Sequence, residues 1–248
     1  MEAIHLLGVR IHALTLDQLL AFIETTVQAN RRAIVANVNV HALNLAYEQP
    51  WFRDFLNRSE LVFCDGFGVK WAARWVGGHL PERLTYADWT WRLAEFAEPR
   101  GLTFFFLGAR PGVAERAAES LKQRFPRLLV LGAQHGFFDK TPGSPDNETA
   151  LRAINVARPN ILILGLGMPV QERWLLENWE RVEANVALTG GAVFDYVSGE
   201  VRRGPRWMTD HGLEWLARLL IEPRRLWKRY LIGNPLFLMR VIEQKLKT

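Results

Sequence analysis

Residues 161–179 read ILILGLGMPVQERWLLENW, and this stretch indicates the fold of the chain. Its first four residues, Ile161–Leu164, are all apolar, which is typical of a strand that is buried on both faces. The glycine turn Gly165-Leu-Gly167 follows, and a helical pattern then covers Gln171–Trp179. A buried strand, a glycine turn and a helix make up the unit from which parallel α/β sheets are built.

The same unit recurs along the first 200 residues. Predicted strands cover Ala33–Val38, Leu61–Cys64, Thr103–Leu107, Leu128–Leu131, Ile161–Leu164 and Val186–Leu188. Predicted helices cover Leu16–Val27, Val69–Val76, Trp89–Phe96, Val113–Phe125, Glu148–Ala157 and Gln171–Trp179. Thr15 and Gln18 have the spacing of a capping box, which opens the first of these helices. We therefore expect an α/β fold, a Rossmann-like parallel sheet with helices on both faces.

Composition excludes several classes of protein. The chain has 248 residues, 49% of them hydrophobic and 23% charged, and its mean hydropathy is −0.05. Such values exclude a disordered or fibrous protein.

The single cysteine, Cys64, excludes an intrachain disulfide and fits a reducing cytosol. The first twenty residues lack the features of a signal peptide, and no uncharged apolar stretch reaches the roughly 18 residues of a membrane span. We therefore predict a cytoplasmic location.

Charge is distributed unevenly along the chain. Residues 201–248 contain eleven lysines and arginines but only four acidic residues, so this segment carries +7 while the whole chain carries +5. The first 200 residues are therefore slightly acidic. We expect two parts, a Rossmann-like domain at 1–200 and a basic helical appendage at 201–248, here called the tail. Because the positive charge is local, it favours a local anionic partner over a nucleic acid that would cover the whole surface.

The middle of the tail has an amphipathic pattern. At about 100° per residue, one helix face would carry Leu226, Trp227, Tyr230 and Leu231. The opposite face would carry Arg224, Arg225, Lys228 and Arg229. This combination is typical of a helix that lies on an anionic membrane surface. A terminal helix that packs on the body is the alternative, and a homo-oligomer that covers the apolar face is another.

Small and polar residues follow the predicted strands, where an open parallel sheet binds its ligands. The candidates for binding a nucleotide or sugar phosphate are Asn39, Asp65, Gly108, Arg110, Gly167, Gly190 and Gly191. Asn37, near the end of the predicted strand Ala33–Val38, is a further substrate-binding candidate. Asp65 would act as a general base or ligand anchor, or else cap the next helix. Arg83 and Arg110 would hold phosphate or remain solvated. Gln171 and Glu172 would face the crevice or merely complement the helix dipole.

Other patterns argue against a metal or a nucleotide cofactor. The glycine turn lacks the third glycine of a dinucleotide fingerprint, because Val170 stands there. The six histidines show no metal-ligand spacing. The acids of Asp146-Asn-Glu148 could imitate a pair that holds a divalent ion, but they open a helix and capping is the better interpretation. We therefore predict no cofactor and no metal site.

Taken together, the motifs resemble the WecG/TagA/CpsF glycosyltransferases. The resemblance is carried by Asn39, Asp65-Gly66, Arg83, Leu107-Gly108, 165–172 (GLGMPVQE), Gly190-Gly191, Phe194-Asp195, Ser198-Gly199, 203–207 (RGPRW), 213–215 (LEW), Arg218 and 222–230 (EPRRLWKRY), in this order. It implies an inverting, metal-independent transfer of a sugar from a UDP donor to a saccharide linked to polyprenyl diphosphate. The best expectation is transfer of N-acetylmannosamine to N-acetylglucosaminyl-diphospho-undecaprenol. A different hexose or a uronic acid, used in exopolysaccharide synthesis, is the alternative.

The resemblance also implies roles for individual residues. Asp65 matches the proposed base, and Asn39, Arg83 and Gln171 match residues around the donor or acceptor. Arg218, Arg225 and their basic neighbours match an appendage that closes over the site at the inner face of the cell membrane. Three residues depart from the family pattern near the expected sugar pocket: Asn37 in place of threonine, Tyr86 in place of glycine and Val170 in place of lysine.

Two other functions compete with this hypothesis. One is a non-catalytic nucleotide-binding module whose basic tail binds nucleic acid, although the body is acidic and no nucleic-acid motif occurs. The other is a UDP-sugar epimerase or dehydrogenase, which would require the missing dinucleotide fingerprint. We expect a UDP-sugar, a polyprenyl-diphosphate-linked saccharide and an anionic membrane surface as partners, and no nucleic acid.

Overall fold

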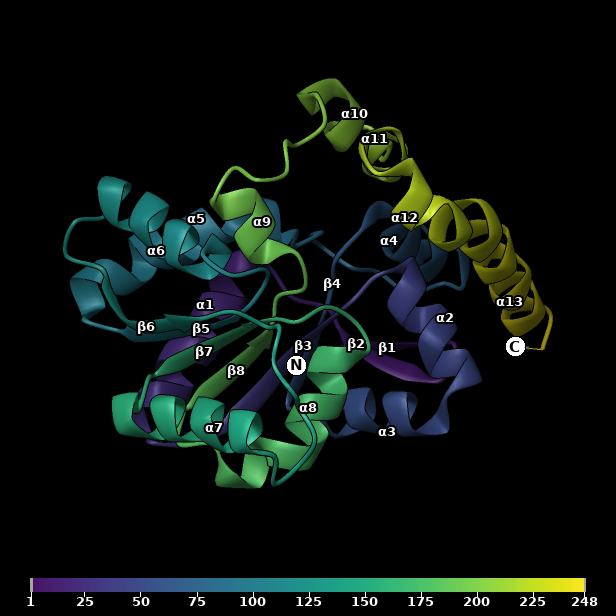
Figure 1. Cartoon of the computed structure of the whole chain (residues 1–248). Coiled ribbons are helices and arrows are strands. Elements are labelled where there is room, and N and C mark those ends of the chain that lie inside the picture. The colour runs from purple at the N-terminus through teal and green to yellow at the C-terminus, as the bar shows by residue number, and fades with distance from the viewer. Residues whose placement is uncertain (1, 248) are drawn as a thin grey trace.

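A six-stranded parallel sheet forms the centre of the computed structural model, which describes residues 2–247 (Figure 1). The strands lie in the order β4-β3-β8-β7-β5-β6. Their bounds are β3 Ala33–Val38, β4 Leu61–Cys64, β5 Thr103–Gly108, β6 Leu129–Gln134, β7 Ile161–Gly165 and β8 Val186–Thr189. All six predicted strands are therefore confirmed, with small differences at their ends, and so is the parallel pairing.

Helices cover both faces of this sheet, as predicted. One face is covered by α1 (Leu16–Gln28), α5 (Tyr86–Ala97), α6 (Val113–Arg124) and α9 (Val193–Val197). The other is covered by α2 (Val40–Glu48), α3 (Pro50–Arg58), α7 (Pro145–Ala157) and α8 (Val170–Asn178), with α4 (Phe67–Trp75) beside them. Alternate residues of β7 enter the two cores: Ile161 and Ile163 pack on one side, Leu162 and Leu164 on the other. This is why the strand is apolar throughout.

Several short elements were not predicted from the sequence. Ala3–Leu6 (β1) and Val9–His12 (β2) form an antiparallel hairpin, and its turn residues Leu7 and Gly8 both have positive φ. The short helices α2 and α3 lie between β3 and β4, and the 3-10 turns η1 (Glu98–Arg100) and η2 (Trp179–Arg181) extend α5 and α8. The capping box at Thr15 and Gln18 is confirmed.

The tail leaves the body after α9 and runs over one side of the molecule (Figure 1). It contains α10 (Arg206–Asp210), α11 (Glu214–Ile221), α12 (Pro223–Trp227), the π-helical turn η3 (Lys228–Ile232) and α13 (Gly233–Lys247). The last helix is fixed to α2, because the Asn44 amide donates to the Gly233 carbonyl at 2.8 Å and Arg240 pairs with Glu48 at 2.8 Å. The tail is therefore helical, as expected, and packed on the body.

The predicted division of the tail into one apolar and one basic face is wrong. Leu226 and Tyr230 are buried, whereas Trp227 and Leu231 are 43% and 56% exposed. Within α12 only Leu226 is buried, so the adjacent Trp227 is not on the face that packs on the body. The π-helical turn that follows needs more residues per turn than an α-helix and so breaks the 100° period from Lys228 on. Arg229 accordingly turns inward beside the Tyr230 ring, 5.6 Å from its centroid.

Candidate active site at the carboxyl edge of the sheet

Asp65 directly follows β4 and is held in place by two neighbours on β3. Its backbone N–H donates to the Val38 carbonyl at 2.8 Å, which extends the β3–β4 ladder by one residue. One carboxylate oxygen of Asp65 accepts a hydrogen bond from the Asn37 side-chain amide at 2.9 Å. Asp65 therefore lies at the carboxyl edge with a defined orientation, as the strand-end pattern predicted.

Burial raises the pKa of Asp65 to about 6, and the negative charge of Glu214 adds to the increase. The Arg83 charge, the Asn37 hydrogen bond and the Arg218 charge act in the opposite direction. A carboxylate with a pKa near 6 is largely ionised at pH 7, yet it is a stronger base than an ordinary aspartate. Perturbation of this kind, at the carboxyl edge of a parallel sheet, is typical of a catalytic carboxyl group.

Asn37 connects Asp65 to the neighbouring strand β8. Its backbone N–H donates to the Thr189 hydroxyl at 3.1 Å, and that hydroxyl donates to the Asn37 side-chain oxygen at 3.0 Å. Asn37 is 4% exposed and Thr189 is fully buried. Three adjacent strand ends are thus joined by side chains, and Thr189 is a site residue that the sequence reasoning did not single out.

Gln171 and Glu172 are both buried beneath the end of β8. The Gln171 side-chain oxygen accepts from the Gly191 backbone N–H at 3.0 Å, and its amide donates to one Glu172 oxygen at 2.8 Å. Within residues 2–247 the second oxygen of Glu172 has no hydrogen-bond partner. Burial raises the pKa of Glu172 to about 8. Both side chains are enclosed by the protein, so they do not form a solvated helix terminus.

Tyr86 is buried within electrostatic reach of the carboxyl groups of Asp65 and Glu172. Its ring packs on Phe63 of β4, with centroids 5.7 Å apart, and its hydroxyl is buried without a hydrogen-bond partner in the described part of the chain. Burial raises the pKa of Tyr86, and the charges of Asp65 and Glu172 raise it further. This residue, one of the three departures from the family pattern, is therefore next to the site.

The tail brings further charged side chains to Asp65. Glu214 of α11 forms an ion pair with Arg83, which lies in the loop between α4 and α5, at 2.7 Å. Arg218, one helical turn after Glu214, lies over the Tyr196 ring at 5.6 Å. Burial lowers the pKa of Arg229, whereas the charge of Asp65 raises it. Residues far apart in the sequence therefore surround one carboxylate.

Other predicted site residues have local structural partners. The Asn39 side chain caps α2 by accepting from the Ala42 N–H at 3.1 Å. Arg110 is 61% exposed and pairs with Glu200 at 3.2 Å. A Cβ at Gly108 would lie 2.3 Å from the Gly165 backbone, so glycine is needed there for the close approach of β5 and β7.

The other glycines and cations among the predicted site residues have the following conformations and contacts. Gly167 and Gly191 have φ values of +79° and +58°, in the left-handed region that favours glycine. A Cβ at Gly190 would lie 2.6 Å from the Val193 side chain. Arg225 pairs with Glu222 at 2.8 Å, and Arg224 and Lys228 are exposed.

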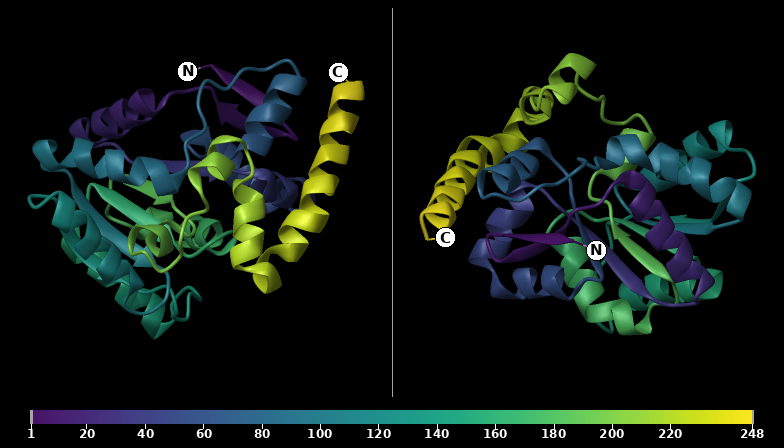
Figure 2. Two further views of the ribbon diagram at one scale, coloured as in Figure 1. Left: turned by 90° about the horizontal axis from the view of Figure 1, so that it is seen from above. Right: turned by 180° about the vertical axis from the view of Figure 1, so that it is seen from behind.

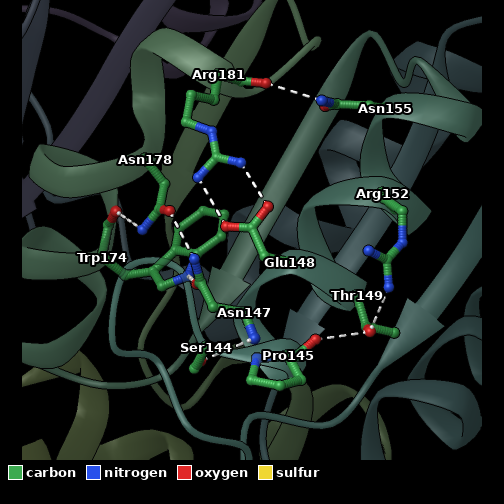
Figure 3. Close-up of polar contacts among 10 residues, drawn as sticks. All are labelled: Ser144, Pro145, Asn147, Glu148, Thr149, Arg152, Asn155, Trp174, Asn178 and Arg181. Carbon is green, nitrogen blue, oxygen red and sulfur yellow. Dashed lines mark hydrogen bonds and ion pairs between the residues drawn. The ribbon is translucent and has the colours of Figure 1, made fainter.

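The acidic residues at the start of α7 have structural partners, and Figure 3 shows that of Glu148. Glu148 forms a two-point ion pair with Arg181, at 2.8 and 2.5 Å, and Asp146 accepts from the Asp139 backbone N–H at 3.2 Å. The N-cap of the helix is Ser144, two residues before the acids, so the capping residue was misplaced in the prediction. No group of three or more His, Cys, Asp or Glu side chains that could hold a metal ion occurs among the described residues.

No helix within residues 2–247 combines the length and the apolar character of a membrane span.

Comparison with known proteins gives a consistent result. The family model described as "Glycosyl transferase WecG/TagA/CpsF family" matches residues 4–248. The N-acetylglucosaminyldiphosphoundecaprenol N-acetyl-beta-D-mannosaminyltransferase of Staphylococcus aureus strain NCTC 8325 is 25% identical over 98% of this chain and 94% of that protein. The proteins of the same name from strains COL and MW2 are also 25% identical, with the same coverage.

Proposed function

Because the chain belongs to the WecG/TagA/CpsF family of glycosyltransferases, we propose that it transfers N-acetylmannosamine from a UDP donor to N-acetylglucosamine linked to polyprenyl diphosphate. The names of its relatives support this donor sugar and this acceptor. The observation that carries the proposal is the site of Asp65, a carboxylate oriented by Asn37 and surrounded by arginines from two parts of the chain.

In the proposed reaction Asp65 is the general base. Its carboxylate takes the proton of the attacking hydroxyl of the acceptor sugar, and the oxygen forms a bond to the anomeric carbon of the donor. The bond between that carbon and the UDP oxygen breaks, and UDP leaves from the opposite side with its electron pair. A single displacement of this kind inverts the anomeric configuration and leaves the proton on Asp65.

The leaving diphosphate needs positive charge close to the reacting carbon. Arg83 and Arg218 act on the charge of Asp65, and the pKa of Arg229 responds to that charge, so these side chains lie within electrostatic reach of the base. Guanidinium groups bind phosphate oxygens in a bidentate manner and remain charged at every physiological pH. We assign to them the stabilisation of the UDP leaving group and of the acceptor diphosphate.

The tail would bring this chemistry to the membrane. Arg224 and Lys228 are exposed on the same segment that supplies Arg218 and Arg229 to the site. Basic residues near an anionic bilayer contribute on the order of 1 kcal/mol each. We therefore propose a peripheral protein at the inner face of the cell membrane, where a lipid-linked acceptor would be available, with residues 201–248 as its membrane-associating appendage.

A transfer assay tests the proposal. A synthetic N-acetylglucosaminyl-diphospho-lipid and a panel of UDP-sugars, including the uronic acid and other hexoses, are incubated with the full chain in EDTA. Release of UDP with a larger lipid-linked product is expected for the N-acetylmannosamine donor. Asp65→Asn should reduce kcat by at least about 10³-fold. Asp54→Asn, an exposed position on α3, is the matched control and should retain full activity. Wild-type turnover by the Asp65 variant would exclude its role as base.

A further inference from the structure

The outward face of α4 carries a stripe of exposed aromatic rings. Phe67, Trp71 and Trp75 recur at intervals of four residues and are 38%, 53% and 38% exposed. The two tryptophan rings lie side by side, with centroids 5.2 Å apart. Side chains on the opposite face of the helix, such as Val69 and Ala72, are fully buried in the core. The exposure is therefore not that of a frayed segment but of one face of a well-packed helix.

This stripe begins at the candidate active site. Phe67 follows Asp65 by two residues, and the Arg83 guanidinium lies over the Phe67 ring at 4.9 Å. The tail packs here as well, since a Cβ at Gly212 would lie 3.1 Å from the ring. Because a helix rises 1.5 Å per residue, Trp75 lies about 12 Å further along the helix than Phe67. The exposed rings thus lead from the candidate active site to the flank of the molecule.

A second helix extends the apolar area. The views in Figure 2 show α13 beside α4, and the two helices are in contact. Exposed apolar side chains of α13 are Leu238 (40%), Met239 (56%), Ile242 (37%) and Leu246 (82%). Ile242 lies about 160° around the helix from Arg240, which faces α2. We call Phe67, Trp71, Trp75 and these four residues the flank surface.

We propose that the flank surface is a membrane contact that enters the interfacial region of an anionic bilayer and is separate from the basic segment 224–229. Exposed apolar side chains that gather on two helices in contact mark an interaction site. Tryptophan is the residue type that prefers the boundary between headgroups and acyl chains. The partner that fits is an anionic lipid surface, because exposed cations accompany the apolar residues on both helices and outnumber the one exposed acid there, Glu243. These cations are Arg74 on α4 and Lys245 and Lys247 on α13.

Contact through the flank surface would orient the protein on the membrane as well as increase its affinity for lipid. Contact through α4 places the Phe67 end of the helix, and with it Asp65 two residues earlier in the chain, close to the headgroup layer. A diphosphate linked to a membrane lipid would meet Arg83 at that level. This role of Arg83 rests on the proposed function, whereas binding of the flank surface to lipid does not.

The first experiment measures sedimentation of the full chain with vesicles of phosphatidylglycerol and phosphatidylethanolamine. Trp71→Ser/Trp75→Ser should weaken partitioning at least about tenfold, although the tail is intact. Phe137→Ser/Val156→Ser removes two side chains of even greater exposure, 69% and 87%, from other surfaces and should bind like the wild type. Circular dichroism and the thermal midpoint establish that each variant is folded. If the double variant does not fold, the single variant Trp71→Ser replaces it.

A second arm uses two acceptors. With a short-chain, water-soluble acceptor and no vesicles, the Trp71/Trp75 variant should retain the wild-type kcat/KM. With a long-chain acceptor in vesicles, its kcat/KM should fall in parallel with its binding to the vesicles.

Unchanged vesicle binding would overturn the proposal. Loss of turnover with the soluble acceptor would instead show that the rings contact the substrate chain. A wild-type dimer that the variant converts to a monomer would assign the flank surface to a second copy. Vesicle binding requires no catalysis, so absence of transfer with every donor would count against the proposed function alone.

Discussion

The carboxylate of Glu214 lies 2.7 Å from the guanidinium of Arg83, and neither side chain is more than 20% exposed. One residue belongs to the tail and the other to the loop that precedes α5, so the contact joins two segments 131 residues apart. Both charges act on Asp65, Glu214 raising its pKa and Arg83 lowering it. The protonation of the proposed base therefore depends on where the tail lies.

The pH dependence of catalysis should reveal this coupling. With a pKa of about 6, Asp65 must lose its proton before it can act, so kcat/KM should rise with pH through about pH 6. Glu214→Gln removes a charge that raises the pKa, and should therefore move the acid limb to lower pH. The measurement is kcat/KM between pH 4.5 and 8. Glu200→Gln, which loses a surface pair with Arg110, is the control. An acid limb that stays in place would contradict the coupling of Glu214 to Asp65.

Thr189 should be required for the orientation of Asp65. Thr189→Val removes the hydroxyl that bonds the Asn37 N–H and side-chain oxygen, leaving two buried polar groups unpaired. The expected cost is about 2–4 kcal/mol in the free energy of unfolding, with a fall of about tenfold or more in kcat. Thr189→Ser keeps the hydroxyl and should recover most of both quantities. Urea unfolding and steady-state kinetics measure them, and a stable Val variant with normal kcat would refute the role.

Glu172 should make the folded protein less stable as pH rises. Its pKa is about 8 in the folded state and 4.5 in the unfolded chain, so the folded state holds the proton more tightly between these values. The stabilisation is complete below the unfolded value and is lost as pH increases, by at most about 1.4 kcal/mol per pH unit. Glu172→Gln cannot titrate. The free energy of unfolding of this variant, relative to that of the wild type, should therefore increase from pH 5.5 to pH 8. Urea unfolding at several pH values measures this difference, and a difference that does not change with pH would contradict the assignment.

Asn147 should matter for stability and not for catalysis. Its amide donates to Asn178 at 2.9 Å, and its oxygen accepts from the Trp174 indole at 2.8 Å, all three side chains being buried (Figure 3). Asn147→Ala should cost about 2–4 kcal/mol because it leaves unpaired groups and a cavity. In the folded fraction kcat/KM should be unchanged. Ser144→Ala, which removes the neighbouring N-cap, should cost about 1 kcal/mol. A large loss of kcat/KM at full folding would place this network in the site.

The frame of the fold could be predicted because it depends on local patterns. A strand buried on both faces must be apolar throughout, and this is visible in Ile161–Leu164 without knowledge of its neighbours. Parallel strands end at one edge, so the pattern also indicated that Asp65 and Gly191 would share that edge with Gln171. The hairpin turn at Leu7-Gly8 was missed because its strands, AIHL and VRIH, mix polar and apolar residues and lack the uninterrupted apolar run that marks a strand such as Ile161–Leu164.

The contacts across the site could not be predicted in the same way. Glu214 reaches Arg83 only because the tail folds back over the body, and no periodicity within either segment encodes this. Thr189 looks like any polar residue at the end of a strand until the β3–β8 register places it beside Asn37. The two-face prediction for 224–231 assumed a uniform helix, which the π-helical turn does not allow.

The position of α11 has a practical consequence for deletion experiments. A fragment that ends before α10 loses the cations that we propose to bind lipid, but it also loses Glu214, Arg218 and Arg229, whose charges interact with that of Asp65. Inactivity of such a fragment would therefore not distinguish a protein that cannot reach its membrane from one whose base is mistuned. Only single substitutions on α11, assayed with a soluble acceptor, distinguish the loss of membrane binding from the loss of catalysis.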